Sequence, residues 1–132
     1  MPQFADHCFI DLFSKEKLVR RVMRHAGDWT PPPGTFAEIG EQVEYPPDHF
    51  SSRAMGRRDA VLVEDFVAHR FSAPSAASKR VGDELGITSV ISAPLLARGE
   101  LLGVVSLSLS KLTSRPDSHY DGFDREIGRA HV

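Results

Sequence analysis

The sequence predicts an α+β fold in which a central antiparallel sheet of about five strands carries helices on both faces. Three observations lead to this prediction. Short segments in which apolar and polar residues alternate lie toward both ends of the chain and predict strands. Two of the connections between such segments have room only for a hairpin turn. Segments with apolar residues at helical spacing separate the strands, so the predicted order is β-β-α-(α)-β-α-β-β-α.

The first predicted pair of elements is a hairpin. Phe4–Phe13 alternates in character, with Cys8 and Ile10 in the same phase, and Leu18–His25 is rich in strand-forming residues. The polar residues Ser14–Lys17 between them are too few for anything but a turn.

The middle of the chain reads less clearly. Ala26–Gly34 contains three consecutive prolines and is predicted to be a loop. A short helix is predicted to begin at Thr35, because Glu38 lies three residues later, as in a capping box. A weaker helix is expected over His49–Met55, and the apolar run Ala60–Phe66 predicts a short buried strand.

The strongest predicted helix is Ser72–Leu85. Pro74 suits its first turn, where the missing backbone donor costs nothing. Val81 and Leu85 lie four residues apart on one face. Gly86 can then adopt the left-handed conformation that ends helices.

The last third of the chain predicts a second hairpin followed by a helix. Ser89–Ala97 and Glu100–Ser110 are strands joined by the tight turn Arg98-Gly99. Asp121 is expected to begin a final helix, whose apolar stripe still continues where the sequence stops at Val132.

Composition narrows the class of protein. A chain of 132 residues corresponds to one domain, expected to span residues 1–132. Its charge of 16 − 18 = −2 argues against a nucleic-acid partner bound by phosphate neutralisation. Cys8 is the single cysteine, so an internal disulfide is impossible and a reducing cytoplasm is the expected location. The sequence has neither a signal peptide nor an apolar run near the ~20 residues of a membrane span, so no membrane insertion is expected.

Leu85–Leu107 carries the strongest resemblance to a known family. It reads LGITSVISAPLLARGELLGVVSL, and this strand, glycine turn and Leu-Gly-Val-Val-Ser-Leu strand resemble the closing hairpin of a GAF domain. The opening ADHCFIDL, the middle YPPDHFSSRAMGRRDAVLVEDF and the terminal FDREIGRAH are similar to GAF segments in the same order. These sequence segments are most like those of GAF domains in bacterial sensor histidine kinases and PP2C-type regulatory phosphatases.

The resemblance implies a GAF-like (profilin-like) sheet in a bacterial sensory module for signal transduction, as in two-component systems. In the family, one face of the sheet carries a ligand pocket and the other carries the terminal helices, which pair in a dimer. Compared with the family, we expect the N-terminal helix to be absent from this chain and the C-terminal helix to be truncated. The implied partners are an unidentified small-molecule ligand, a linked kinase or phosphatase effector domain and a second copy in a homodimer. No catalytic residue is expected in this chain itself.

The sequence lacks the motifs of family members with known ligands, so it identifies no cofactor. Phe123 is present without the Asn-Lys that precedes it in cyclic-nucleotide-binding members. Cys8 lies too early in the chain to attach a bilin. The six histidines have no metal-site spacing and no metal ligand is assigned, although His7 and His25 can meet across the first hairpin. A single His such as His69 suffices for haem.

A ligand pocket must use one alternation phase of each strand. In Glu100–Ser110 one phase is wholly apolar and the other carries three serines, and semi-polar lining suits a pocket. In Leu18–His25 the chosen phase also contains Arg21, which fits it poorly. The same rule applied throughout gives the expected ligand-binding residues: His7, Phe9, Met23, His25, Ser78, Val81, Val90, Ser92, Val104 and Ser106. Two alternatives remain open: the serines allow a helix to pack closely, or the pocket uses the opposite phase.

Three functions remain open. The first is a sensory domain that binds a small molecule and controls a linked effector through its terminal helices. The second is a ligand-free structural dimerisation module, with the pocket side filled by Phe36, Phe50, Phe66 and Phe71. The third is a haem- or thiol-based redox sensor that uses Cys8.

Overall fold

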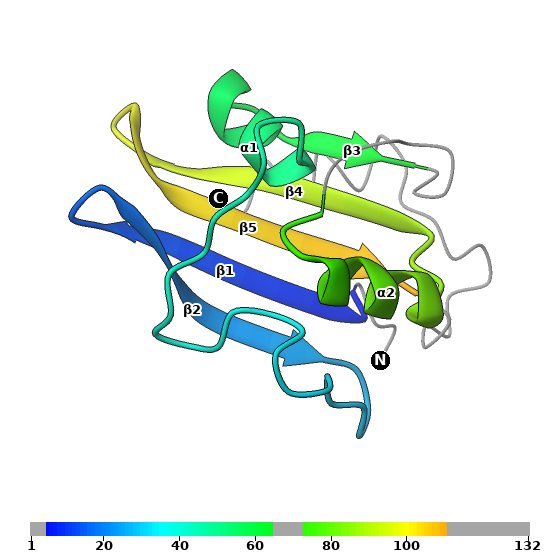
Figure 1. Cartoon of the computed structure of the whole chain (residues 1–132). Coiled ribbons are helices and arrows are strands. Elements are labelled where there is room, and N and C mark those ends of the chain that lie inside the picture. The colour runs from blue at the N-terminus through cyan, green and yellow to red at the C-terminus, as the bar shows by residue number, and fades with distance from the viewer. Residues whose placement is uncertain (1–4, 65–72, 111–132) are drawn as a thin grey trace.

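The computed structural model describes residues 5–64 and 73–110 of the chain (Figure 1). Five strands form one sheet in the order β2-β1-β5-β4-β3, and each neighbouring pair is antiparallel. The predicted α+β class with a five-stranded antiparallel sheet is therefore confirmed. The elements are β1 His7–Ser14, β2 Lys17–His25, α1 Phe50–Arg57, β3 Val61–Val63, α2 Ala76–Leu85, β4 Ser89–Ala97 and β5 Glu100–Leu109.

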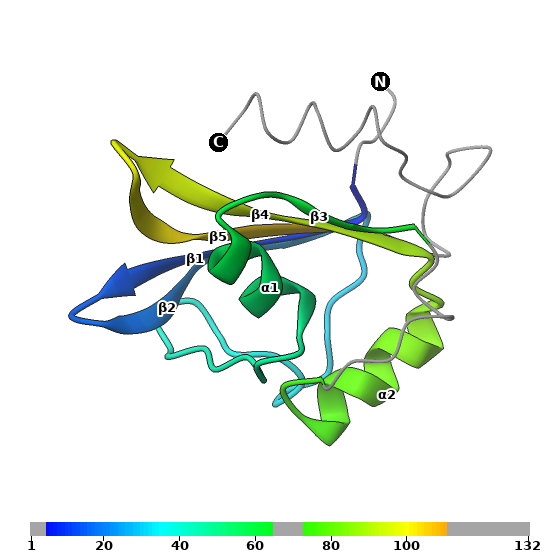
Figure 2. The same cartoon turned by 90° about the horizontal axis from the view of Figure 1, so that it is seen from above.

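Both described helices lie on the same face of the sheet (Figure 2). α1 packs directly on β3, β4 and β5, whereas α2 lies farther from the strands (Figure 2). Val61, Val81 and Val90 belong to the apolar cluster that joins these elements. The helix expected from Asp121, which would cover the other face, lies outside the described residues. None of the described helices has the length and apolarity needed to cross a membrane.

The two predicted hairpins are confirmed, and their turns share a geometry. In the β4–β5 turn, Arg98 and Gly99 have φ angles of 53° and 78°. In the β1–β2 turn, Lys15 and Glu16 have φ angles of 53° and 68°. Consecutive left-handed residues suit the right-handed twist of a hairpin, but side chains other than Gly, Asn and Asp adopt this conformation at a cost.

A β-bulge in β2 decides which side chains face the helices. Ile10 pairs with Val22 and Asp11 with Arg20, so Arg21 has no partner position in β1. An extra residue reverses the alternation phase of a strand. Arg20, rather than Arg21, therefore lies on the same face of the sheet as Met23 and His25.

The helix predicted to begin at Thr35 is wrong, because this segment pairs with the edge of β2 instead. The backbone N–H of Gly40 donates to the Arg20 carbonyl at 2.8 Å, and the N–H of Val43 donates to Leu18 at 2.8 Å. Gly40 has a φ of 92°, which a helix cannot accommodate. Strand-edge pairing thus satisfies the backbone groups that a helix would have used, and the Thr35 hydroxyl donates to the carbonyl of Pro32.

The two observed helices begin later than the sequence predicts. Ser75 caps α2, with its hydroxyl accepting from the Ser78 N–H at 3.0 Å, so Pro74 lies before the helix rather than in its first turn. Gly86 ends α2 in the left-handed conformation, as expected. His49 caps α1 through a side-chain nitrogen that accepts from the Ser51 N–H.

Candidate functional site

A cavity of about 860 Å³ lies between the helical face of the sheet and α2. Its described walls come from β1, β2, β4, β5, the segment of residues 34–51, and α2 with its flanking residues. A volume of this size is in the range of small-molecule sites. α2 lies apart from the strands (Figure 2), and residues of both α2 and the strands line the cavity.

Five of the ten expected site residues line this cavity. They are His7, Phe9, Ser78, Val90 and Ser106. They come from β1, α2, β4 and β5, so the chosen alternation phase faces the helices.

The other five expected residues are not part of the described lining and lie around it. Met23 contacts Arg20 through its sulfur, and His25 contacts His7. Val81 belongs to the apolar cluster, and Val104 is fully buried. Ser92 is fully buried, within hydrogen-bond distance of Ser106.

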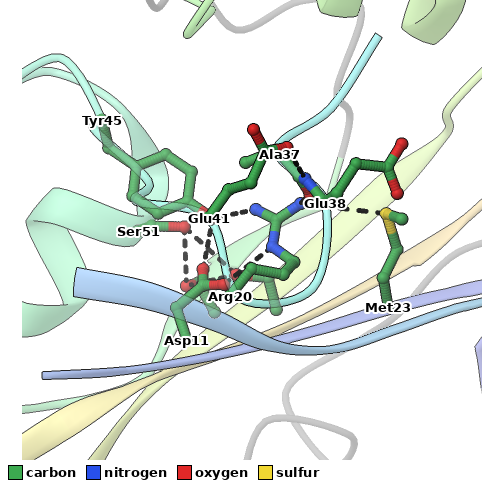
Figure 3. Close-up of polar contacts among 10 residues, drawn as sticks. Asp11, Arg20, Met23, Ala37, Glu38, Glu41, Tyr45 and Ser51 are labelled. Atoms are coloured by element: carbon green, nitrogen blue, oxygen red, sulfur yellow. Dashed lines mark hydrogen bonds and ion pairs between the residues drawn. The ribbon is translucent and has the colours of Figure 1, made fainter. Parts of the chain in front are cut away.

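Asp11, Arg20 and Tyr45 form a buried charged cluster at the cavity wall (Figure 3). The Arg20 Nε donates to one Asp11 oxygen at 2.8 Å, and the Tyr45 hydroxyl donates to the other at 2.6 Å. Arg20 also donates to the Tyr45 hydroxyl and to the Ala37 carbonyl, both at 3.1 Å, and its guanidinium lies 4.4 Å from the centre of the Phe9 ring. The cluster therefore fastens residues 37–45 to the sheet.

The charges in this cluster are matched inside the protein. Asp11 is fully buried and Arg20 is only 3% exposed, so water solvates neither charge and the two side chains neutralise each other. Burial, together with the negative charge of Asp11, raises the pKa of Tyr45 well above its ordinary value. The phenol therefore keeps its proton and acts as a donor to Asp11. Sequence analysis missed the cluster, because the β-bulge and the distant Tyr45 leave no periodic signal.

A second polar cluster is a hydrogen-bonded chain that includes both predicted hairpin histidines. The Ser110 hydroxyl donates to the Asp6 carboxylate at 3.1 Å, so it accepts from the His7 Nε2–H at 3.2 Å. His7 Nδ1 must then accept from the His25 Nδ1–H, at 2.9 Å. This order leaves a lone pair on His25 Nε2, which is buried and has no hydrogen-bond partner among the described residues.

The histidines of the site are held neutral. Burial, assisted by the neighbouring His25, lowers the pKa of His7 to about 4. Burial followed by the charge of Arg20 lowers the pKa of His25. Burial also lowers the pKa of His49 to about 4, against the opposing effect of Asp48. Within residues 5–64 and 73–110, no three His, Cys, Asp or Glu side chains gather in a way that could hold a metal ion.

Three serine hydroxyls join α1 to the sheet. The Oγ atoms of Ser51, Ser92 and Ser106 lie 3.1–3.4 Å apart, and all three residues are buried. Small side chains let α1 approach the strands closely, as one of the alternatives held, and Ser106 borders the cavity as well.

The phenylalanines, the haem candidate and the cysteine named by the sequence analysis lie in different places. Phe36 and Phe50 line the cavity while packing on the apolar cluster. Phe66, Phe71 and His69 lie outside the described residues. Cys8 is half-buried, and burial raises the pKa of its thiol, which disfavours the reactive thiolate.

Comparison with known proteins agrees with this architecture. The family model described as "GAF domain" matches residues 5–127. No curated protein matches the chain in sequence. The fold is similar to that of solved GAF domains at low sequence identity.

Three solved structures illustrate the similarity. The GAF domain of a two-component sensor histidine kinase from Bacillus halodurans has a TM-score of 0.56 at 14% identity, over 98% of this chain and 87% of that one. The GAF domain of a phosphoenolpyruvate-protein phosphotransferase from Coxiella burnetii has a TM-score of 0.61 at 15% identity, over 96% and 67%. The blue-light absorbing form of the PixJ GAF domain from Thermosynechococcus elongatus has a TM-score of 0.58 at 12% identity, over 93% and 67%.

Proposed function

Because the chain belongs to the GAF domain family, we propose that it is a sensory domain that binds a small molecule and controls a linked effector domain. GAF domains are generally non-catalytic sensory and regulatory domains. The observation that carries the proposal is the cavity of about 860 Å³, whose wall combines aromatic and aliphatic side chains with polar and charged ones. A ligand would act by binding two arrangements of the domain with different affinities.

The proposal extends to the setting of the domain. The similar domain from a sensor histidine kinase supports a histidine kinase as the effector, with a regulatory phosphatase as the alternative. We place the domain in the bacterial cytoplasm as a homodimer. Sedimentation of the purified chain tests the dimer.

A melting-temperature screen against a metabolite panel tests ligand binding. A ligand at 100 times its dissociation constant stabilises the folded state by about 2.7 kcal/mol, which raises the melting temperature by several degrees. Ser108→Phe places a ring in the cavity and should abolish the shift. Ser14→Phe, the same change at an exposed position, should keep it. A panel without any stabilising ligand would favour the structural dimerisation module.

A further inference from the structure

The described wall of the cavity has an excess of negative charge. Its two cationic side chains are already paired: Arg20 with Asp11 at 2.8 Å, and Lys79 with Asp83 at 3.2 Å. An anionic ligand would therefore find no unpaired cation in this part of the wall.

Two carboxylates of the same wall have no cationic partner. Glu41 accepts the backbone N–H of Glu38 at 2.6 Å, and Glu44 accepts the side-chain amide of Gln42 at 3.0 Å. Both are exposed residues at the rim of the cavity. Neither forms a salt bridge within the described ranges. Their field attracts cations toward the opening and repels anions.

Aromatic rings of the same wall gather in two groups. Phe9 and Phe36 lie with their centres 5.2 Å apart, and Tyr45, His49 and Phe50 form a second group with centre distances of 4.6 and 3.9 Å. The face of an aromatic ring carries negative electrostatic potential and attracts cations, as the guanidinium over Phe9 already illustrates. The two neutral histidines of the wall, His7 and His49, add no positive charge at neutral pH.

We infer that the cavity takes an organic cation with a flat aromatic body, with its charge directed toward Glu41 and Glu44 and its ring among the aromatic side chains. The inference rests on the proposed function, because it names the class of ligand for the same cavity. A flat aromatic cation is attracted both by the carboxylates of Glu41 and Glu44 and by the aromatic rings, whereas an anion of the same shape is attracted by neither.

Three probes of nearly the same shape separate charge from shape: N-methylquinolinium, the neutral 1-methylnaphthalene and the anionic 1-naphthoate. Affinities are measured by calorimetry and ligand-observed NMR at low salt. N-methylquinolinium should bind roughly tenfold more tightly than either of the others. Its affinity should fall as salt screens the two carboxylates.

Charge-neutralising variants then locate the effect. The double variant Glu41→Gln/Glu44→Gln should weaken binding of N-methylquinolinium roughly three- to tenfold and leave 1-methylnaphthalene unchanged. Glu38→Gln removes the same kind of charge from a neighbouring residue that is not part of the described lining, and should change neither affinity.

The outcomes are distinguishable from failure of the proposed function. Equal or tighter binding of 1-naphthoate or 1-methylnaphthalene overturns the cationic class but supports a small-molecule site. Equal loss in the Glu38→Gln control also overturns it. If none of the three probes binds, the inference is wrong, and the metabolite panel alone decides whether the domain binds small molecules.

Discussion

The two hairpins of the sheet differ in what they bury. β4–β5 buries apolar side chains and small hydroxyls, among them Val90, Ile91 and Ser92. β1–β2 buries an ion pair between Asp11 and Arg20, together with a nearly inaccessible histidine, His7. The β1–β2 hairpin therefore depends on polar contacts, both between its own strands and with Tyr45 and Ser110. The β4–β5 hairpin gains mainly from the removal of apolar surface from water.

The largest effect is expected from breaking the ion pair. Arg20→Ala leaves the Asp11 carboxylate buried without its cation and should lower the free energy of unfolding by about 3–5 kcal/mol. The neighbouring Arg21→Ala, at the exposed bulge position, should change it by less than about 0.5 kcal/mol. Urea denaturation of both variants measures this contrast. Equal effects would show that the buried pair has no special role.

The contribution of each buried histidine to the pH dependence of stability should come next in size. His7 and His49 have pKa values of about 4 in the folded protein, whereas an exposed histidine has a pKa of 6.5, so between these pH values the unfolded chain binds protons that the folded chain does not. The free energy of unfolding should therefore be level above about pH 7 and fall as the pH drops from 6.5 to 4, by on the order of 3 kcal/mol for each histidine.

His7→Gln should reduce this slope by less than half, because His49 and His25 contribute to it as well. Urea denaturation of the wild type and the variant across this pH range provides the test. An unchanged slope would contradict the assignment to His7.

The close contact between the two hairpins should also be sensitive to an added side chain. A Cβ atom at Gly103 in β5 would overlap the backbone carbonyl oxygen of Asp11 in β1. Gly103→Ala should lower the free energy of unfolding by about 1–3 kcal/mol, because backbone must move.

Gly56→Ala is the matched control, since a Cβ at this position in α1 meets nothing within 4 Å. It should stabilise the protein by about 0.5–1 kcal/mol. Thermal unfolding of both variants checks the opposite signs.

The smallest effect concerns the turns. Lys15 and Glu16 both adopt left-handed conformations without glycine, whereas the β4–β5 turn already contains Gly99. Lys15→Asn/Glu16→Gly should raise the free energy of unfolding by about 1 kcal/mol, and Arg98→Asn by less. If calorimetry shows no gain in the double variant, the turn conformation is not costly.

The same contrast explains how far the sequence was informative. The bounds of β4, Ser89–Ala97, were predicted correctly because alternation and a turn containing Gly99 are local signals. The bulge at Arg21 was not predicted, because a regular alternation of residues does not show where a strand contains an extra residue. The helix at Thr35 was wrong because a local capping signal competed with pairing to a strand edge.

For the candidate site, alternation identified the face that carries the cavity and five of the residues that line it. It missed Tyr45 and the rim acids, which lie in an irregular segment whose path depends on tertiary contacts with β2. Contacts between residues as distant as Asp6 and Ser110 likewise have no local signature.

The central claim is that a small molecule binds on the helical face of the sheet. Side-chain ¹H–¹³C NMR spectra of the chain with a stabilising ligand from the panel test it most directly, because successive side chains of one strand point to opposite faces of the sheet. The account predicts the largest shifts around Phe9, Ser106 and Ser108, and small ones at Cys8 and Leu107. Shifts concentrated at Cys8 and Leu107 would contradict it.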